Sequence, residues 1–272
     1  MTTTLDRRAQ PPTAPGLLSR EPQRSFASRG ATWTGQADLA ILGTTVAVWA
    51  HPDDETYLAG GLLATLSDAG QRVVCVTATR GDAGNGLHDG GTAAARAALA
   101  ELRTAELDAA LDVLGIVEHR WLDYADGHCQ QVDVDQAGGR LLQIFDEVRP
   151  ETVVSFGPDG FSGHPDHQAV SHWTTWAVER WHPRPQLLQP VTTAHDRAAA
   201  SDIDHRLRTY GWSFPASLHL DDLAVRVVLH RDQLDRKVEA LRLQSSQTAE
   251  LMSAVGQPRF AAWVSSESFR AA

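Results

Sequence analysis

The chain has 272 residues, of which 42% are hydrophobic, and a formal net charge of −10 at pH 7. This length and composition suit one large α/β domain with a packed core, and the acidic balance argues against a nucleic-acid surface, which needs a basic patch. No stretch approaches the roughly 20 apolar residues that cross a bilayer, and the polar start lacks the apolar region of a secretory signal. These features favour a cytoplasmic enzyme.

Residues 1–42 form an extension before the main pattern. Its first part is rich in Pro, Arg, Ser and Thr, which is typical of a disordered terminus, whereas residues 38–42 could pack against the domain. We expect residues 43–272 to form the single catalytic domain, with residues 183–229 as a variable region on the substrate side.

From residue 44 the pattern alternates between strand and helix. Apolar, β-branched runs predict strands, and apolar stripes at helical spacing predict helices. Strands separated by helices at this spacing predict a Rossmann-like, doubly wound, mostly parallel sheet with helices on both faces. The expected strands are residues 44–50, 72–79, 118–122 and 152–156, and the expected helices are residues 51–69, 93–115, 132–148 and 164–181.

Beyond residue 183 the alternation loosens. Residues 186–194 and 218–229 could be strands, and residues 230–246 have the pattern of a helix. We expect this region to form much of the substrate pocket.

Two His-Pro-Asp motifs stand directly after predicted strands. They are Ala50-His51-Pro52-Asp53-Asp54-Glu55 and Gly163-His164-Pro165-Asp166-His167. Parallel strands end at one edge of a sheet, where α/β folds place their chemistry, so the two motifs should meet there. Histidine and carboxylate ligands with one coordination position left open describe a catalytic zinc site.

These two motifs, in this order, resemble those of the LmbE-like, or GlcNAc-PI de-N-acetylase, family of zinc-dependent deacetylases and amidases. The resemblance runs from about Thr45 into the C-terminal region. It implies that His51, Asp54 and His167 bind zinc, although iron(II) could occupy the same ligand set. The residues alone also allow a simpler interpretation, in which one histidine caps a helix and the other lies on the surface.

The resemblance implies roles for three further motif residues. Asp53 is expected to be the general base that takes the proton of an attacking water, and His164 to stabilise the oxyanion or protonate the leaving amine. Asp166 would then hold the ring of His164. Either acid could instead serve only as a favourable charge at a helix N-terminus, and the same alternatives apply to Glu55.

Arg103 and Asp126 match positions that contact the sugar in mycothiol-pathway deacetylases. A guanidinium can donate to hydroxyls or a phosphate, and a carboxylate can accept from hydroxyls; a solvated helix charge and a turn residue are the alternatives. The chain departs from relatives at Ser162, where some have a tyrosine proposed to assist at the oxyanion, and at Gln244, where many have a histidine.

Together these features predict a zinc-dependent hydrolase that cleaves an N-acetyl or other N-acyl amide bond of an amino-sugar-containing small molecule. An amidase of a larger thiol conjugate or antibiotic glycoside is one alternative, and a non-catalytic metal-binding homologue is another. No nucleic acid or membrane partner is expected, and the eight tryptophans leave room for a homo-oligomeric interface.

Overall fold

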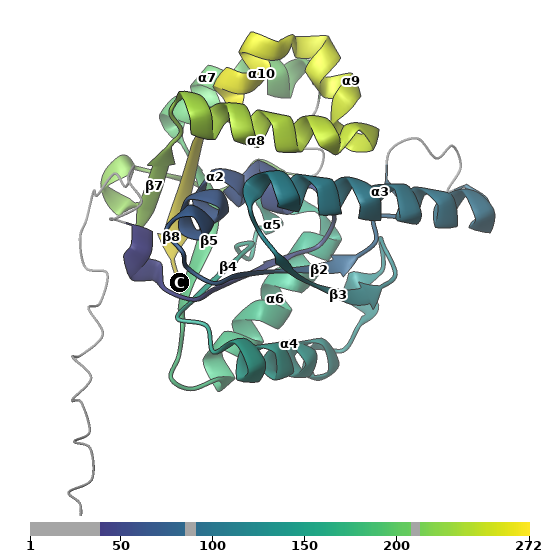
Figure 1. Ribbon diagram of the computed structural model, residues 1–272, viewed down its shortest axis with the longest axis vertical. Helices are drawn as coiled ribbons and strands as arrows, with labels where there is room; N and C mark the ends of the chain where they lie inside the picture. The colour runs from purple at the N-terminus through teal and green to yellow at the C-terminus, as the bar shows by residue number, and fades with distance from the viewer. Residues whose placement is uncertain (1–38, 85–90, 208–212) are drawn as a thin grey trace, which may run out of the picture.

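The computed structural model describes residues 39–84, 91–207 and 213–272, which form one mixed sheet flanked by helices (Figure 1). The strands are β1 (Thr45–Trp49), β2 (Val73–Thr79), β3 (Glu118–Tyr124), β4 (Thr152–Ser155), β5 (Gln186–Thr193), β6 (Ser217–Leu218), β7 (Val225–Val228) and β8 (Ser266–Ala271). The α-helices are α2 (Asp54–Asp68), α3 (Ala93–Leu114), α4 (Val134–Val148), α5 (Gly160–Gly163), α6 (Pro165–Arg180), α7 (Ala194–Leu207), α8 (Arg231–Leu243), α9 (Ser245–Val255) and α10 (Gln257–Trp263).

The strand order is β3-β2-β1-β4-β5-β8-β7, and β6 pairs with the end of β5. Strands β1 to β5 are parallel to their neighbours among themselves, whereas β8 runs antiparallel to both β5 and β7. The chain moves outward from β1 through β2 to β3 and then returns to β4 on the other side of β1. The predicted mostly parallel sheet is confirmed, and its switch point lies between β1 and β4.

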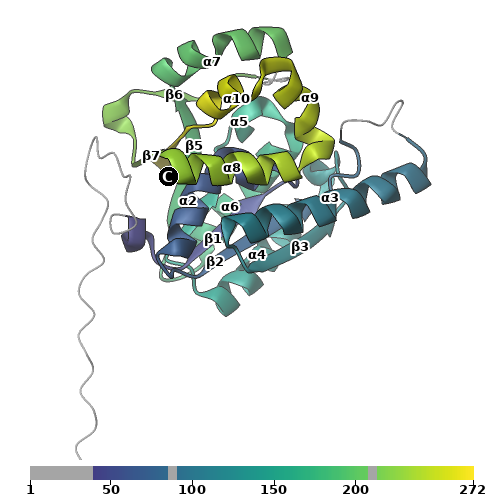
Figure 2. The ribbon, with the colours of Figure 1, turned by 45° about the horizontal axis from the view of Figure 1, so that its top comes forward.

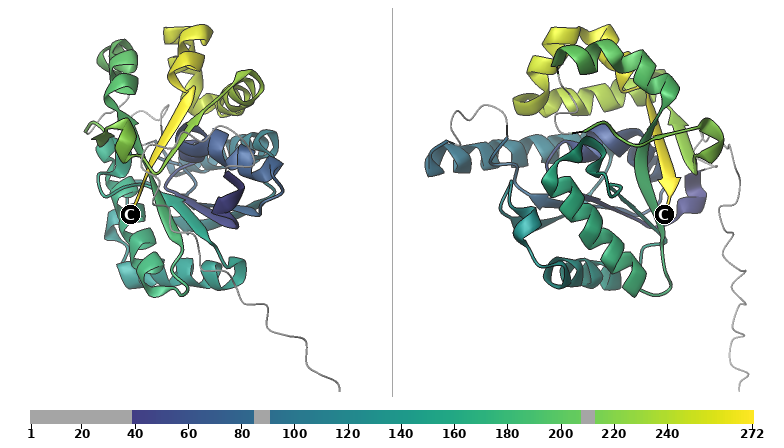
Figure 3. Two further views of the ribbon diagram at one scale, coloured as in Figure 1. Left: turned by 90° about the vertical axis from the view of Figure 1, so that its left-hand side faces the viewer. Right: turned by 180° about the vertical axis from the view of Figure 1, so that it is seen from behind.

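Helices cover both faces of the sheet. Helices α2, α3 and α8 lie on one face, and α4 and α6 lie on the other (Figures 1 and 3). The helices α7, α9 and α10 gather at one end of the molecule, next to α8 and the strands β5 and β8 (Figure 2). Strands β1 and β2 are therefore buried on both sides, which explains why their sequences are continuous apolar runs.

Part of the N-terminal extension packs against this core. Leu39 and Leu42 are buried, and the Thr152 hydroxyl donates to the carbonyl of Leu42 at 2.7 Å. Leu39 and Leu42 therefore pack on the domain as predicted, whereas Ile41 is exposed, and residues 1–38 lie outside the described part of the chain. The same is true of residues 85–90, which belong to the glycine-rich loop after β2.

The C-terminal region differs from the predicted pattern. The expected strand at 218–229 is divided into β6 and β7 by a 3-10 turn at Leu220–Asp222, where the polar His219, Asp221 and Asp222 interrupt the apolar pattern. The expected helix at 230–246 ends as α8, because Gln244 leaves the helical conformation (φ −85°, ψ 44°) where its side chain enters a buried contact. Strand β8 was not predicted, because Phe269 is its only large apolar residue.

A buried ion pair joins the C-terminal elements to α2. The ammonium of Lys237, the only lysine in the sequence, lies 2.7 Å from the Glu267 carboxylate and also donates to the carbonyl of Tyr57. Glu267 accepts from two successive α2 amides, of which Gly61 is the first. A side chain at Gly61 would place its Cβ 2.3 Å from Leu229, so this close approach requires glycine.

Candidate active site

The polar side chains of the site follow the carboxyl ends of four neighbouring parallel strands. The first motif follows β1, Gly81 follows β2, Asp126 follows β3 and the second motif follows β4. In open α/β sheets this edge, at the switch point, is where a crevice forms. The predicted meeting of the two His-Pro-Asp motifs is therefore observed.

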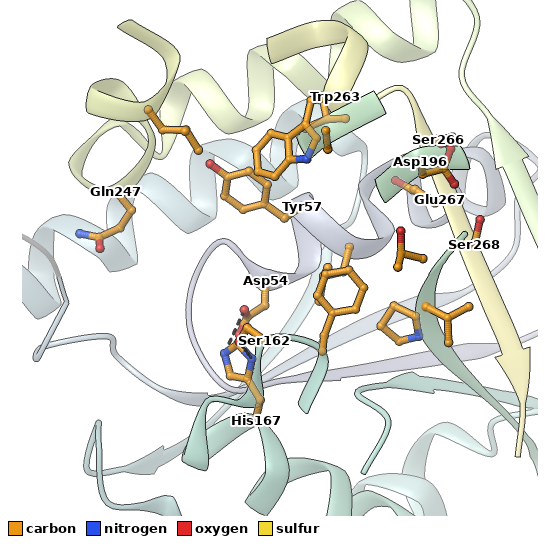
Figure 4. Close-up of a pocket in the computed structure, with 18 of the residues that line it drawn as sticks. Asp54, Tyr57, Ser162, His167, Asp196, Gln247, Trp263, Ser266, Glu267 and Ser268 are labelled. Carbon is orange, nitrogen blue, oxygen red and sulfur yellow. Dashed lines mark hydrogen bonds and ion pairs between the residues drawn. The ribbon is translucent and has the colours of Figure 1, made fainter. Parts of the chain in front are cut away.

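Three side chains of these motifs converge on one point. His51 Nδ1 lies 3.2 Å from His167 Nε2, the Oδ2 atom of Asp54 lies 3.6 Å from His51 Nδ1, and its Oδ1 atom lies 3.3 Å from His167 Nε2. Metal–ligand bonds of about 2.0 Å in a tetrahedral zinc site place ligand atoms about 3.3 Å apart. The spacing of the three side chains therefore suits such a site with one position left open. Figure 4 shows Asp54 and His167 facing each other.

The second ring nitrogen of each histidine contacts an oxygen acceptor. His51 Nε2 lies 3.1 Å from Asp126 and 3.4 Å from Asp166, and His167 Nδ1 lies 3.0 Å from the carbonyl of Gly160. The ring of His167 also stacks on Phe156. These contacts orient each ring, with the outer nitrogen toward an oxygen acceptor and the inner nitrogen toward the centre, as in many metal sites.

Asp126 and Asp166 are buried and held by backbone amides. Asp126 accepts from the amide of Ala83 at 2.7 Å, and Asp166 accepts from the amides of Gly127 and Cys129. Burial raises the pKa of both carboxyls, and hydrogen bonds with His51 more than offset this, so that both pKa values lie below the ordinary value. Both carboxylates thus contact the ring of His51 and help to orient it. The expected contact of Asp166 with the ring of His164 stays a prediction.

Negative charge is concentrated around the convergent atoms. Burial lowers the pKa of His51, but hydrogen bonds with Asp126, Asp166 and Asp54 raise it well above its ordinary value. Buried carboxylates at this density are costly unless they are paired or coordinate a cation. The donor set therefore fits a divalent metal ion. Two overlapping groups of donors also lie within 4.8 Å of one another, namely His51–His164–His167 and His51–Asp126–Asp166.

Asp53 stands beside the convergent atoms in a strained backbone conformation. Its φ of 112° lies in a region that non-glycine residues rarely adopt. Burial is the largest cause that raises the pKa of Asp53, to about 7, with Asp54 and Glu55 adding to it and Arg103 opposing it. A carboxyl with a pKa near neutrality is matched to general-base catalysis, although a cation at the centre would lower this pKa.

Arg103 lies inside the site rather than on the helix surface. It is 4% exposed and donates to the carbonyls of Gly81 and Pro52, and its guanidinium lies 3.4 Å from the Asp53 carboxylate. The alternative of a solvated helix charge is therefore wrong. In these contacts Arg103 ties the loop after β2 to the first motif; its predicted contact with the sugar stays a prediction.

A buried network behind Asp53 was not predicted. The Glu55 carboxylate accepts from the amide of Asp53 at 3.0 Å and from the side-chain amide of Gln244 at 2.7 Å. Gln244, at the position where the chain departs from many relatives, therefore contacts Glu55. No local pattern could reveal this network, because 189 residues separate Gln244 from Glu55.

His164 begins helix α6 and faces the metal-site histidines. Its Nδ1 accepts from the amide of Asp166 at 3.1 Å, and its ring centroid lies 4.9 Å from those of His51 and His167. Burial lowers the pKa of His164, which favours the neutral ring. Because Nδ1 accepts a hydrogen bond, the neutral ring carries its proton on Nε2.

A pocket of about 560 Å³ opens from this centre. Asp54, Ser162 and His167 lie at one end, and Asp196, Ser266 and Ser268 lie at the other (Figure 4). Ser162 lies 3.3 Å from His167 Nδ1, which places it beside a ligand residue. Most of the wall comes from residues after 186, as expected for the region beyond residue 183.

The chain is similar to known deacetylases in sequence and in fold. The family model for GlcNAc-PI de-N-acetylase (PIG-L) matches residues 46–178. A 1D-myo-inositol 2-acetamido-2-deoxy-alpha-D-glucopyranoside deacetylase of Kineococcus radiotolerans is 30% identical over 76% of this chain and 70% of its own length, and one of a Mycobacterium species is 34% identical over 74% and 72%. The N,N'-diacetylchitobiose deacetylase of Pyrococcus horikoshii has a similar fold, with a TM-score of 0.55 and 20% identity over 84% of this chain and 83% of that one.

The fold and the strand-end centre define a Rossmann-like α/β hydrolase with a candidate His–Asp–His metal site. The chain belongs to the GlcNAc-PI de-N-acetylase, or LmbE-like, family, and it is an enzyme that hydrolyses N-acyl amide bonds. In the part of the chain that the structure describes, no helix is long and apolar enough to span a membrane.

Proposed function

We propose that the protein removes the N-acetyl group from a neutral glycoside of N-acetylglucosamine, with His51, Asp54 and His167 holding a zinc ion. The observation that carries this proposal is the convergence of three donor side chains, with contacts of 3.2–3.6 Å between their donor atoms, at the strand-end edge. When bound there, zinc supplies Lewis acidity that polarises a carbonyl and lowers the pKa of a water molecule. Iron(II) would fit the same donors.

Asp53 is the proton acceptor of the proposed reaction. It neighbours the ligand Asp54 and belongs to neither of the other donor groups, so its carboxylate can take the proton of the attacking water. The contacts of Glu55 with its amide and of Arg103 with its carboxylate hold it in place. These contacts explain how the chain maintains a positive φ at this residue.

His164 is the hydrogen-bond donor to the oxyanion. Its neutral ring, with the proton on Nε2, can donate to oxygen as negative charge develops on the acyl carbonyl. The chain has Ser162 at the position where some relatives carry a tyrosine, so we assign this donation to His164. The proton taken by Asp53 can pass to the leaving nitrogen as the C–N bond breaks, so that the neutral amine departs.

The charge of the pocket favours a neutral substrate. Among the described residues that line it there is no lysine or arginine, whereas Asp54, Asp196, Glu250 and Glu267 contribute carboxylates. Glu267 and Asp196 are paired with Lys237 and Arg226 behind the wall, so the described lining offers no cation that would bind a phosphate group. A neutral inositol glycoside of N-acetylglucosamine, of the kind named for the relatives, suits it.

The test is acetate release from N-acetylglucosaminyl inositol by the zinc-loaded chain, with metal content measured in parallel. We expect about one ion per chain and turnover. Asp53→Asn should keep the ion while kcat falls by about 10²- to 10⁴-fold, because it removes the base. Metal without turnover on any N-acetylglucosaminide would favour the alternative, an amidase of a larger conjugate. Loss of metal in Asp53→Asn would contradict the role given to Asp53.

A further inference from the structure

The pocket ends, away from the metal centre, at a second polar cluster formed by Asp196, Ser266 and Ser268, which we call the far site (Figure 4). Asp196 comes from α7, and the two serines come from β8. Because all three line the same pocket as Asp54 and His167, a ligand that reaches the metal centre can extend to the far site. None of its residues has a role in the proposed hydrolysis.

The far site is held in place by groups behind it. The guanidinium of Arg226 donates to both oxygens of Asp196, at 2.8 Å and 3.0 Å, and to the Ser268 hydroxyl at 2.7 Å. Thr193 donates to the same carboxylate at 2.8 Å. Burial raises the pKa of Asp196, and the bonds from Arg226 and Thr193 more than offset this, so the carboxyl stays ionised at neutral pH.

These contacts decide what the far site presents to a ligand. Ser268 accepts from Arg226, so its own proton is free to donate, and the half-buried Asp196 and Ser266 add oxygen acceptors. Arg226 itself is not among the residues that line the pocket. A negatively charged ligand would therefore meet the carboxylate rather than the guanidinium, and hydroxyl groups are the complementary partners.

The pocket wall also carries apolar and aromatic side chains, beside polar ones such as Thr192 and Gln247. Tyr57 and Trp263 line it with ring centroids 5.8 Å apart, and Phe161 and Leu251 lie along the same pocket. Such rings suit the C–H face of a saturated ring. An alkyl chain would satisfy this wall but would leave the hydroxyl proton of Ser268 without an acceptor. A polyhydroxylated ring satisfies both.

We propose that the far site binds the hydroxyl groups of a neutral polyol ring, the second unit attached to the amino sugar that is hydrolysed at the metal centre. This inference rests on the proposed function for the direction in which the substrate lies. Its own support is the cluster of Asp196, Ser266 and Ser268, preorganised by Arg226 at the end of the catalytic pocket.

The test compares two probes, N-acetylglucosamine and N-acetylglucosaminyl inositol. Their dissociation constants are measured by calorimetry on zinc-loaded Asp53→Asn protein, which should bind both probes with little turnover. Ser268→Ala and Asp196→Asn are made in this background. The matched control is Asp202→Asn, because Asp202 is also an α7 aspartate paired with an arginine, Arg259, but is exposed and does not line the pocket.

We expect the glycoside to bind more tightly than the monosaccharide. Each far-site variant should raise the dissociation constant of the glycoside by up to about tenfold, the size of one lost hydrogen bond, and leave that of N-acetylglucosamine unchanged, while Asp202→Asn changes neither. Steady-state KM values in the native background should follow the same pattern.

Three results would overturn the inference: equal binding of the two probes, equal weakening of both by Ser268→Ala, or tighter binding of an octyl glycoside than of the inositol glycoside. The native chain could instead bind the inositol glycoside tightly, with dependence on Ser268, but release no acetate. That result would contradict the proposed function and support the far site.

Discussion

The two halves of the sheet differ in how their residues reach the pocket. In the parallel half, β1 to β4, each strand end delivers a short polar segment directly to the metal centre. In the other half, β5 and the antiparallel β8 deliver the far site and, with α7, α9 and α10, most of the pocket wall. The proposed catalytic groups thus come from local motifs, whereas the proposed substrate-binding wall depends on the packing of segments far apart in the sequence.

The largest effect is expected from His167→Ala, which changes a candidate metal ligand in the parallel half of the sheet. Removal of one of three ligands should reduce bound zinc from about one per chain to near zero at micromolar concentrations and lower turnover by more than about 10³-fold on every substrate, because the Lewis acid is lost. Metal analysis after gel filtration and acetate release measure this. His172→Ala, an exposed histidine on the same helix, is the control. Retention of zinc by His167→Ala would point to another of the donor groups.

Lys237→Met tests the buried ion pair with Glu267, which connects the C-terminal elements to α2. This change leaves the Glu267 carboxylate buried without its cation, and the free energy of unfolding should fall by about 3–5 kcal/mol. Urea denaturation monitored by tryptophan fluorescence gives the value. Arg242→Ala, which breaks an exposed ion pair with Glu239 on the same helix, should cost no more than about 1 kcal/mol. Similar losses for both variants would mean that Lys237 does not anchor the halves.

Asp126→Asn tests whether Asp126 supports the metal site or contacts the substrate. Asp126 contacts Nε2 of His51, so its loss should weaken zinc affinity by about 10- to 100-fold, as measured by competition with a chromophoric chelator. At saturating zinc, KM should change little. A raised KM with unchanged zinc affinity would support the sugar contact that the family resemblance implies, and would remove Asp126 from the support of the metal site.

The smallest effect is expected where the C-terminal half touches the first motif. Gln244→Ala removes a donor to Glu55, which positions Asp53, and should lower kcat by a few-fold, in line with about 1 kcal/mol for one hydrogen bond, with zinc content unchanged. Gln244→His, which restores a ring N–H donor, should recover part of the loss. An unchanged kcat in Gln244→Ala would show that the support of Asp53 is independent of the C-terminal half.

The same contrast explains what the sequence could predict. Strands such as residues 72–79 can be recognised in the sequence, because burial on both faces requires continuous apolar residues. The ligand residues follow from two motifs at strand ends. Strand β8 gave no such signal: it pairs through its backbone on both sides, and its buried positions include Glu267 and Ser268 as well as Phe269.

The contacts that support the site residues could not be predicted from the sequence, because they are long-range. Glu55 with Gln244, Asp126 with His51 and Lys237 with Glu267 all join residues that are distant in the chain. Their chemistry is readable only once the fold has brought them together. The far site is of the same kind, because Asp196 and Ser268 become neighbours through Arg226 on a third element.

The burial of Lys237 also determines how the folded protein meets acylating reagents. Because this is the only lysine and it is 1% exposed, every other basic side chain is an arginine or a histidine, and no side-chain amine is open to an N-hydroxysuccinimide ester in the folded protein. Modification at Lys237 must therefore wait until α8 separates from α2. The labelling rate of this one amine, followed by peptide mass spectrometry, would report how often that separation occurs under native conditions.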